Sequence, residues 1–502
     1  MITQQELEKY LWGAATLLRG LIDAGDYKQY IFPLLFFKRI CDVYDEEYVS
    51  ALKESGGDLK YASFAENHRF QIPKGAHWKH VRENTKNVGS AIQKSMRQIE
   101  KANPDTLYGI FGDAQWTNKD RLSDETLINL LEHFSSQVLS IENVPNDQLG
   151  NGYEYLIKQF ADDSGHTAAE FYTNRTVVEL MTLLMDPRPG ESIYDPTCGS
   201  GGMLLSCVNK LKTDNKEYRS LKLYGQELNL MTSAIARMNM FLHGIEDFKI
   251  VRGDTLKHPA FLERDKLKKF NIALANPPYS IKQWNRAEFG KDPYGRNIYG
   301  TPPQGCADYA FQQHIVKSLD DKNGRCAILW PHGILFRGAE TEMRKKMIES
   351  DVIDAVIGLG PNLFYNSPME ACILVCNKGK KKERRKKILF INAVNEVKRE
   401  GAFSYLTDNN IERIHAAFKK FENISAFSKV IDIETARKNK FSLNLPLYVK
   451  LERSDRSVNN QKKIGISIEE ALSKWQDNSN TLRKSVVSLL SELERQVSGG
   501  SK

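Results

Sequence analysis

The chain has 502 residues, of which 41% are hydrophobic and 27% are charged, and these fractions are ordinary for a globular protein. That length is enough for two or three domains and at least one large hydrophobic core, so a disordered or fibrous protein is excluded. The formal net charge of +8 is a mild excess, which is compatible with a polyanionic partner but does not identify one.

The cysteines and the N-terminus indicate a protein of a reducing compartment. The seven cysteines are scattered and include no Cys-x-x-Cys pair, so we expect small buried side chains, with no disulfides and no metal site. The first residues lack the basic segment and apolar run of a secretory signal, and the early apolar run 30–37 is too short to span a bilayer. We therefore expect a cytoplasmic protein that does not associate with membranes.

Residues 1–150 are predicted to form a helical domain. Five apolar side chains recur at helical spacing, namely Leu7, Leu11, Ala14, Ala15 and Leu18. A second apolar stretch at 31–43 continues the pattern. No group of residues typical of catalysis occurs in this region, so we expect it to serve in docking or binding.

Residues 151–460 are predicted to form a catalytic domain of the α/β class. Short β-rich runs alternate with helical stretches from about residue 190, and they lie at 192–194, 221–224, 248–251, 270–275, 326–330, 353–357 and 371–376. This alternation predicts right-handed βαβ units and a mainly parallel sheet. Ligands of such sheets bind beyond the carboxyl ends of the strands, where the polar motifs of this chain occur.

The first polar motif follows the first predicted strand and opens a helix. It contains Asp195, Thr197, Gly199, Ser200 and Gly201. Its small residues allow the backbone to approach a ligand closely, and the helix N-terminus offers unpaired N–H groups. A phosphate-binding P-loop is excluded because no Gly-Lys-Ser/Thr follows, and the NAD pattern lacks its last glycine.

Two further acids follow the second and third predicted strands. Glu227 is positioned to accept hydrogen bonds from both ribose hydroxyls of a nucleoside, and Asp254 could accept one from an adenine amino group. Either acid alone would be explained as a helix N-cap. Three successive acid-ended strands, followed by a fourth that ends at Asn276, instead favour a nucleoside site.

The most specific motif is Asn276-Pro277-Pro278-Tyr279. An exocyclic amino group is a weak nucleophile because its lone pair is delocalised into the ring. The Asn276 side-chain oxygen and the Pro277 carbonyl could accept its two hydrogens and free the lone pair for attack on a sulfonium methyl. The paired prolines stiffen the loop, and Tyr279 could stack on a base extruded from a duplex.

Two segments outside the motifs carry their own predictions. The basic run 378–387 lies between two apolar runs, so we expect a solvated hairpin tip, with a DNA-contact loop as the alternative. Residues 461–502 are predicted to be a helical tail, whose apolar side chains recur four and three residues apart. That seam is short, so we expect the tail to pack on its own domain or on another subunit.

The motifs together resemble the modification subunits of type I restriction-modification systems, which are N6-adenine DNA methyltransferases. The similarity covers most of the chain and rests on the motifs above and on the segments 11–15, 30–39, 169–173, 307–311 and 335–340. It implies a Rossmann-like S-adenosylmethionine-dependent methyltransferase fold with an N-terminal helical domain and a C-terminal helical tail. Two departures are Asn174, where the family usually has proline, and 367–371, which lacks a small Ile-Pro step.

The resemblance also assigns site residues. Those implied to bind S-adenosylmethionine are Phe171, Tyr172, Thr173, Asp195, Thr197, Gly199, Ser200, Gly201, Glu227 and Asp254. Asn276, Pro277 and Tyr279, on a loop that includes Pro278, are implied to hold the target adenine. The family requires no general base before the attack, because the proton can leave after the amine has been methylated.

The partners follow from the resemblance and from the motif order. Only about 110 residues follow residue 391, too few for a sizeable sequence-reading domain, so we expect a separate specificity subunit to choose the site on double-stranded DNA. A second copy of the modification subunit and, where the system has one, a restriction subunit are also implied. The alternatives are a stand-alone DNA adenine methyltransferase, a protein glutamine methyltransferase and a non-catalytic subunit of the same fold.

Overall fold

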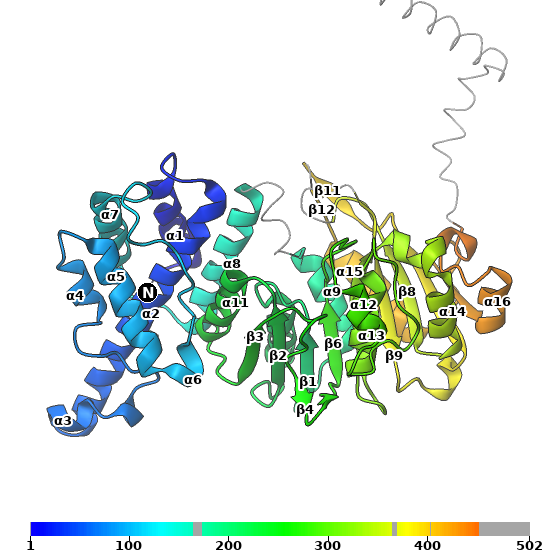
Figure 1. Ribbon diagram of the computed structural model, residues 1–502, viewed down its shortest axis with the longest axis horizontal. Helices are drawn as coiled ribbons and strands as arrows, with labels where there is room; N and C mark the ends of the chain where they lie inside the picture. The colour runs from blue at the N-terminus through cyan, green and yellow to red at the C-terminus, as the bar shows by residue number, and fades with distance from the viewer. Residues whose placement is uncertain (1, 164–172, 364–368, 402, 451–502) are drawn as a thin grey trace, which may run out of the picture. The chain divides into compact units, whose positions relative to one another are not determined.

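A nine-stranded sheet with the order β13-β10-β8-β9-β7-β6-β1-β2-β3 forms the centre of the computed structural model, which describes residues 2–163, 173–363, 369–401 and 403–450 (Figure 1). Its strands are β1 (Ser192–Asp195), β2 (Lys222–Glu227), β3 (Phe248–Arg252), β6 (Ile272–Ala275), β7 (Arg325–Pro331), β8 (Ile353–Leu359), β9 (Ala371–Asn377), β10 (Lys387–Ala393) and β13 (Ser428–Asp432). Two small hairpins lie outside it, β4 (Leu262–Glu263) with β5 (Lys266–Leu267), and β11 (Lys398–Glu400) with β12 (Phe403–Tyr405).

The sheet is mainly parallel, so the predicted α/β class is confirmed. Strands β7, β6, β1, β2 and β3 run parallel to one another. Strand β9 lies between β7 and β8 and runs antiparallel to both, so β8 and its parallel neighbour β10 have the same direction as β7. From β1 the chain proceeds outward to β2 and β3, and it then returns to form β6 on the other side of β1. The strand order therefore reverses between β1 and β6, and a ligand site is expected at such a point.

Helices cover both faces of the sheet, which explains why β6, β7 and β8 are almost continuously apolar. Helices α9 (Arg175–Met185), α10 (Gly202–Thr213) and α15 (Asp408–Lys420) share one hydrophobic core with the sheet. Helices α13 (Asp308–Ser318), α14 (Thr341–Glu349) and α16 (Ile433–Lys438) share the core on the opposite face, while the short α12 (Arg286–Gly290) precedes α13 in the chain.

The N-terminal part is helical and packs against the edge of the sheet domain through α11 (Leu230–Leu242) (Figure 1). Residues of α11 such as Met238 and Phe241 lie in the core of the N-terminal helices, while Met240 lies in the core of the sheet. A helix that is apolar on most sides is expected to be buried in this way. The N-terminal helices are α1 (Gln4–Leu18), α2 (Tyr27–Glu54), α3 (Leu59–Ala62), α4 (Trp78–Arg82), α5 (Val88–Ala102), α6 (Pro104–Leu107), α7 (Asp124–Ser135) and α8 (Asn146–Asp163).

The basic run 378–387 is not a hairpin tip, and that prediction is wrong. The run does connect β9 to β10, but β8 lies between these two strands in the sheet. The segment therefore crosses the end of β8, and some of its basic side chains pack against the residues before and within that strand. Lys380 is buried and its ammonium contacts Asp351, while Arg384 pairs with Asp354. Sequence pattern alone does not distinguish such a crossing from a hairpin, because both join two apolar runs through a short polar segment.

Candidate functional site

The loop between β1 and α10 has a backbone conformation that requires glycine. Gly199 and Gly201 have φ angles of 53° and 83°, in the left-handed region that side chains disfavour. A Cβ atom at Gly201 would also lie 2.7 Å from the Cε of Met240 on α11. The buried Asn239 of the same helix donates from Nδ2 to the Ser200 carbonyl at 3.0 Å. Residues of α11 therefore hold the loop in this conformation.

Two carboxylates, Asp195 and Glu227, flank this loop. Asp195 ends β1 and accepts from the Thr197 N–H at 3.0 Å, and Glu227 ends β2 and accepts from the Gly199 N–H at 3.1 Å. Burial raises the pKa of Asp195 to about 8; the Thr197 N–H opposes this rise, and the negative charge of Glu227 adds to it. Burial also raises the pKa of Glu227, against the backbone N–H groups that it accepts from. A ligand that donates hydrogen bonds to these two carboxylates would stabilise their ionised forms.

Asp254 lies two residues beyond its strand, because β3 ends at Arg252 rather than at the acid. One carboxylate oxygen accepts from the N–H groups of Leu256 and Lys257, at 3.0 and 3.2 Å, and so caps the turn that follows. The preceding Gly253 donates its N–H to the Glu227 carbonyl at 2.8 Å. Asp254 is thereby held next to the end of β2, with one oxygen engaged in the turn.

Asn276 follows β6, and both ends of its amide are held by other side chains. Its Nδ2 donates to Thr173 Oγ1 at 3.0 Å, and its Oδ1 accepts from the Tyr279 hydroxyl. Burial raises the pKa of Tyr279 far above its usual range, so this hydroxyl stays protonated and donates. The Tyr279 ring is tilted against Trp330, at 6.1 Å between centroids. An amide oxygen has two lone pairs, so Asn276 can accept one further hydrogen bond.

A cavity of about 500 Å³ connects the two loops. This volume falls within the usual range for small-molecule sites. Helices α8, α9 and α10 contribute its other walls, and the predicted site residues that line it are Thr173, Asp195, Thr197, Gly199, Ser200 and Asn276. Glu227, Gly201, Asp254, Pro277, Pro278 and Tyr279 are not in its wall, although Glu227 and Tyr279 contact residues that are. Phe171 and Tyr172 lie outside the described residues.

Sequence reasoning gave no role to a polar network that supports the Asn276 loop. The buried Asp308, first residue of α13, accepts from the Ser280 N–H at 2.7 Å, and Ser280 has a φ of 52°. Arg337 pairs with the other oxygen of Asp308 and donates from Nε to Glu340 at 2.9 Å. The sequence identifies the segments 307–311 and 335–340 only by their similarity to the family. Their meeting point follows from the packing of α13 against the loop after β7.

Two other kinds of site have no counterpart in the part of the chain that the structure describes. Its helices include none with both the length and the apolar character that a membrane span needs. No three histidine, cysteine, aspartate or glutamate side chains of the described residues are grouped to hold a metal ion, and the seven cysteines are buried and unpaired.

Comparison with known proteins identifies the family. The model of the N-6 DNA methylase family matches residues 144–457, and the HsdM N-terminal domain matches residues 7–134. The type I restriction enzyme MjaVIII methylase subunit of Methanocaldococcus jannaschii is 33% identical over 488 residues, covering 91% of this chain and 80% of that protein. The HindI methylase subunit of Haemophilus influenzae is 30% identical, covering 72% of this chain and 83% of that protein.

A solved structure agrees with these relatives. The type I restriction-modification methyltransferase subunit of Streptococcus thermophilus is 29% identical, with a TM-score of 0.77, and the match covers 89% of this chain and 100% of that one. The chain therefore belongs to the N-6 DNA methylase family and, within it, to the methylase subunits of type I restriction-modification systems, which are adenine-specific DNA methyltransferases with the S-adenosylmethionine-dependent methyltransferase fold.

Proposed function

We propose that this chain transfers a methyl group from S-adenosylmethionine to N6 of an adenine extruded from double-stranded DNA, with Asn276 as the residue that binds the amino group. The observation that carries the proposal is the fixed amide of Asn276 in the wall of the same cavity as Asp195 and Gly199. An acceptor for an amino group thus lies beside a loop suited to a nucleoside. Extrusion is required because the amino group of a stacked adenine cannot reach a protein pocket.

The residues of the cavity and of the strand ends beside it suit S-adenosylmethionine. We assign the ribose hydroxyls to Glu227, whose carboxylate accepts the N–H groups of Gly199 and Asn229 and keeps lone pairs for further hydrogen bonds, and the adenine amino group to Asp254. Thr197, Ser200 and the glycines of the loop allow the close approach of the donor to the backbone, beside Asp195. Phe171, Tyr172 and Thr173 would cover the donor, which supplies a methyl group on a positively charged sulfonium.

The reaction then depends on how the target amino group is held. The Asn276 side-chain oxygen and the Pro277 carbonyl accept its two hydrogens, which localises the lone pair on nitrogen. The nitrogen–carbon bond forms as the sulfur–carbon bond breaks, and the surplus proton leaves the methylated amine for water. Tyr279 stacks on the extruded base, and its hydroxyl keeps the Asn276 oxygen oriented. Pro277 and Pro278 keep the loop stiff.

We further propose that the chain works within a type I complex, because the relatives that it matches are named as subunits of type I restriction enzymes. A specificity subunit would choose the DNA site, and a second copy of this chain and, where present, a restriction subunit would complete the assembly. Residues 1–150 would act as a docking or clamping domain, 151–460 as the catalytic domain and 461–502 as the docking tail. The tail lies outside the described residues.

Mapping of N6-methyladenine by single-molecule sequencing tests the proposal. The chain is expressed with and without its neighbouring genes in a host that lacks other adenine methylation. Methylation at a split motif is expected only with the specificity gene, and it should be lost in Asn276→Ala. Asn409→Ala serves as the matched control, because Asn409 is exposed on α15 and does not line the cavity. Methylation that persists in Asn276→Ala would overturn the catalytic assignment, and methylation by the chain alone would overturn the delegated specificity.

A further inference from the structure

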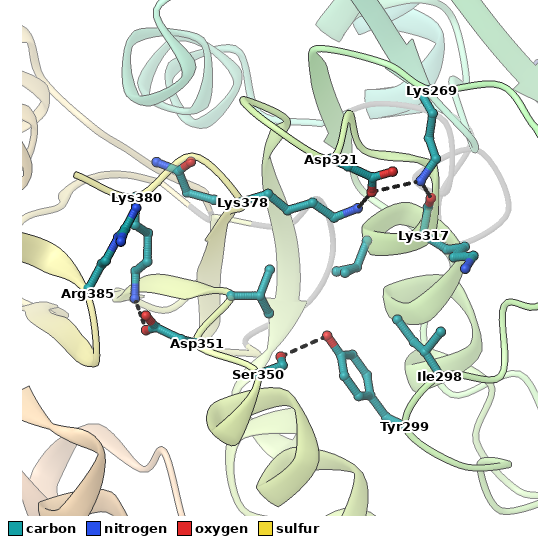
Figure 2. A pocket seen from close by; sticks show the side chains of 13 residues that line it. Lys269, Ile298, Tyr299, Lys317, Asp321, Ser350, Asp351, Lys378, Lys380 and Arg385 are labelled. Atoms are coloured by element: carbon teal, nitrogen blue, oxygen red, sulfur yellow. Dashed lines mark hydrogen bonds and ion pairs between the residues drawn. The ribbon is translucent and has the colours of Figure 1, made fainter. Parts of the chain in front are cut away.

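A second cavity, of about 530 Å³, lies at the amino ends of the parallel strands, opposite the ends that carry the candidate site. Its walls come from the residues just before β6 and β8, from Ile298 and Tyr299, from the end of α13 and from the basic run after β9. The candidate site instead lies beyond the carboxyl ends of β1 and β6. Figure 2 shows the lining side chains, with the Lys378 side chain extending across the cavity toward Asp321. None of these residues takes part in the methyl transfer proposed above.

The charged side chains of this cavity are mostly cationic. It is lined by five basic residues, Lys269, Lys317, Lys378, Lys380 and Arg385, and by two carboxylates, Asp321 and Asp351, which leaves three positive charges in excess. Asp321 is shared between Lys269 and Lys378, whose ammonium groups lie 3.1 and 2.7 Å from its Oδ1. Asp351 pairs with Lys380 at 2.8 Å. Arg385 makes no ion pair within the part of the chain that the structure describes.

The ammonium groups are held in place by the backbone as well as by the carboxylates. Lys380 donates to the carbonyls of Ile353 and Lys387, at 2.7 and 2.8 Å, and its side chain is only 4% exposed. Lys378 and Lys269 donate to the carbonyls of Leu319 and Lys317, at 3.0 and 2.8 Å. An ammonium has three hydrogens, and those of Lys380 and Lys269 are all used, since each donates to two carbonyls and one carboxylate. The donors left for a ligand are those of Lys317 and Arg385 and one hydrogen of Lys378.

The protein alone does not balance these charges. Burial lowers the pKa of Lys378, and the positive charges of Lys269 and Lys317 add to that effect against the pull of Asp321. An anion in the recess would relieve this repulsion, since charges that are removed from water interact more strongly. Lys378 caps the end of α13 and Lys380 caps the first residues of β8 and β10, whereas the exposed Arg385 has no such structural role.

We propose that this cavity is a binding site for a small polyphosphate anion, that is, a nucleoside polyphosphate or an inorganic polyphosphate. The volume suits a ligand of mononucleotide size. The excess of three positive charges suits a ligand with several phosphate oxygens. Lys317, Lys378 and Arg385 can bind these oxygens through charge-assisted hydrogen bonds, while Lys269 and Lys380 contribute only to the local charge. Duplex DNA is a poorer candidate because its phosphates lie on a convex surface, whereas Lys378, with a side chain 19% exposed, lies within the recess. The proposal does not depend on the methylation reaction.

Calorimetric titration of the full chain with three probes tests the site. The probes are inorganic tripolyphosphate, ATP and a short duplex, each at low and high salt. We expect tripolyphosphate or ATP to bind, with affinity reduced about tenfold in Arg385→Glu, because one charge-assisted contact is lost and one repulsion is gained. Tighter binding of ATP than of tripolyphosphate would identify the nucleoside form, and equal binding would identify the inorganic form.

Lys382→Glu is the matched control. Lys382 is exposed in the same basic run and is not in the cavity wall, so this variant makes the same change in net charge outside the recess. Lys378→Gln provides a second variant, which removes a recessed charge without reversing it. Equal losses in Arg385→Glu and Lys382→Glu would overturn the site, because they would indicate general charge attraction. Absence of tripolyphosphate and ATP binding at about 1 mM would also overturn it, as would duplex binding alone that depends on Arg385.

Discussion

Arg337 and Asp308 form an ion pair directly beneath the loop that carries Asn276. Asp308 is fully buried, and its second oxygen accepts the N–H of Ser280, four residues beyond Asn276. Arg337 also contacts Glu340, so the network links α13 and the segment after β7 to the loop. A loop that must bind an extruded base benefits from such support, because small displacements of positioning groups cost much of the rate.

Replacement of Asp308 should slow methyl transfer without weakening the binding of S-adenosylmethionine. In Asp308→Asn the Ser280 N–H can still be accepted, but Arg337 loses the charge of its partner. We expect kcat to fall by about 10- to 100-fold, which corresponds to a loss of some 1.4 to 2.7 kcal/mol of transition-state stabilisation. Single-turnover methylation and calorimetry with the donor measure the two effects. The control is Arg413→Gln, which breaks the ion pair with Glu396 away from the loop; an equal loss of rate there would contradict the role.

Thr173 should control the orientation of the Asn276 amide. Thr173→Val removes the acceptor of the Asn276 Nδ2 hydrogen bond while keeping the shape of the side chain. We expect kcat to fall about tenfold, because the amide loses its fixed orientation, and Thr173→Ser should restore most of the rate. Methylation kinetics with saturating DNA are the measurement. A Thr173→Val enzyme with unchanged kcat and weakened donor binding would assign Thr173 to the donor alone.

The hydroxyl and the ring of Tyr279 should make separate contributions to the reaction. Tyr279→Phe loses the hydroxyl that donates to Asn276 but keeps the ring. We expect about a three- to tenfold loss in kcat, the range for one hydrogen bond, with little change in KM for DNA. Tyr279→Ala should in addition raise KM for DNA, because base stacking on the ring is lost. If Tyr279→Phe and Tyr279→Ala were equally impaired in both parameters, the assignment of stacking to the ring would be wrong.

Gly201 should tolerate no side chain. Gly201→Ala forces a Cβ to within 2.7 Å of Met240 Cε at a φ of 83°, so it combines left-handed strain with a clash. Gly190→Ala is the matched control, since Gly190 has a φ of 81° and nothing within 4 Å of the added atom. We expect Gly190→Ala to cost about 1 to 2 kcal/mol of unfolding free energy and Gly201→Ala to cost more and to lose donor binding. Chemical denaturation gives both values; equal costs would exclude the clash.

Asp195 should make the stability of the ligand-free protein depend on pH. Its pKa in the folded state is about 8, against an ordinary value of 3.8, so between these two values the folded protein holds more protons than the unfolded chain. Stability should therefore fall as the pH rises through this window, because unfolding releases a carboxyl that ionises more easily. Asp195→Asn should flatten the decline. Thermal unfolding across the window tests this, and identical slopes for the two proteins would contradict the buried acid.

The sequence by itself predicted the α/β class, most strands of the main sheet and the loops that follow β1, β2 and β6. It could do so because the alternation of apolar runs and polar ends is local, and strands of a parallel sheet must end at a common edge. The same local reading misjudged the end of β3, where Asp254 lies in the following turn. Element ends depend on a few hydrogen bonds that a pattern does not encode.

Tertiary structure alone decided which distant side chains meet. Thr173 and Asn276 are 103 residues apart, and only the packing of α9 beside β6 joins them. Strand order likewise decided that β8 separates β9 from β10, so that the basic run borders a recess instead of forming a hairpin tip. The Arg337–Asp308 pair arises in the same way. Periodicity specifies which face of an element is buried, but the partner of a polar side chain depends on how elements far apart in the chain pack together.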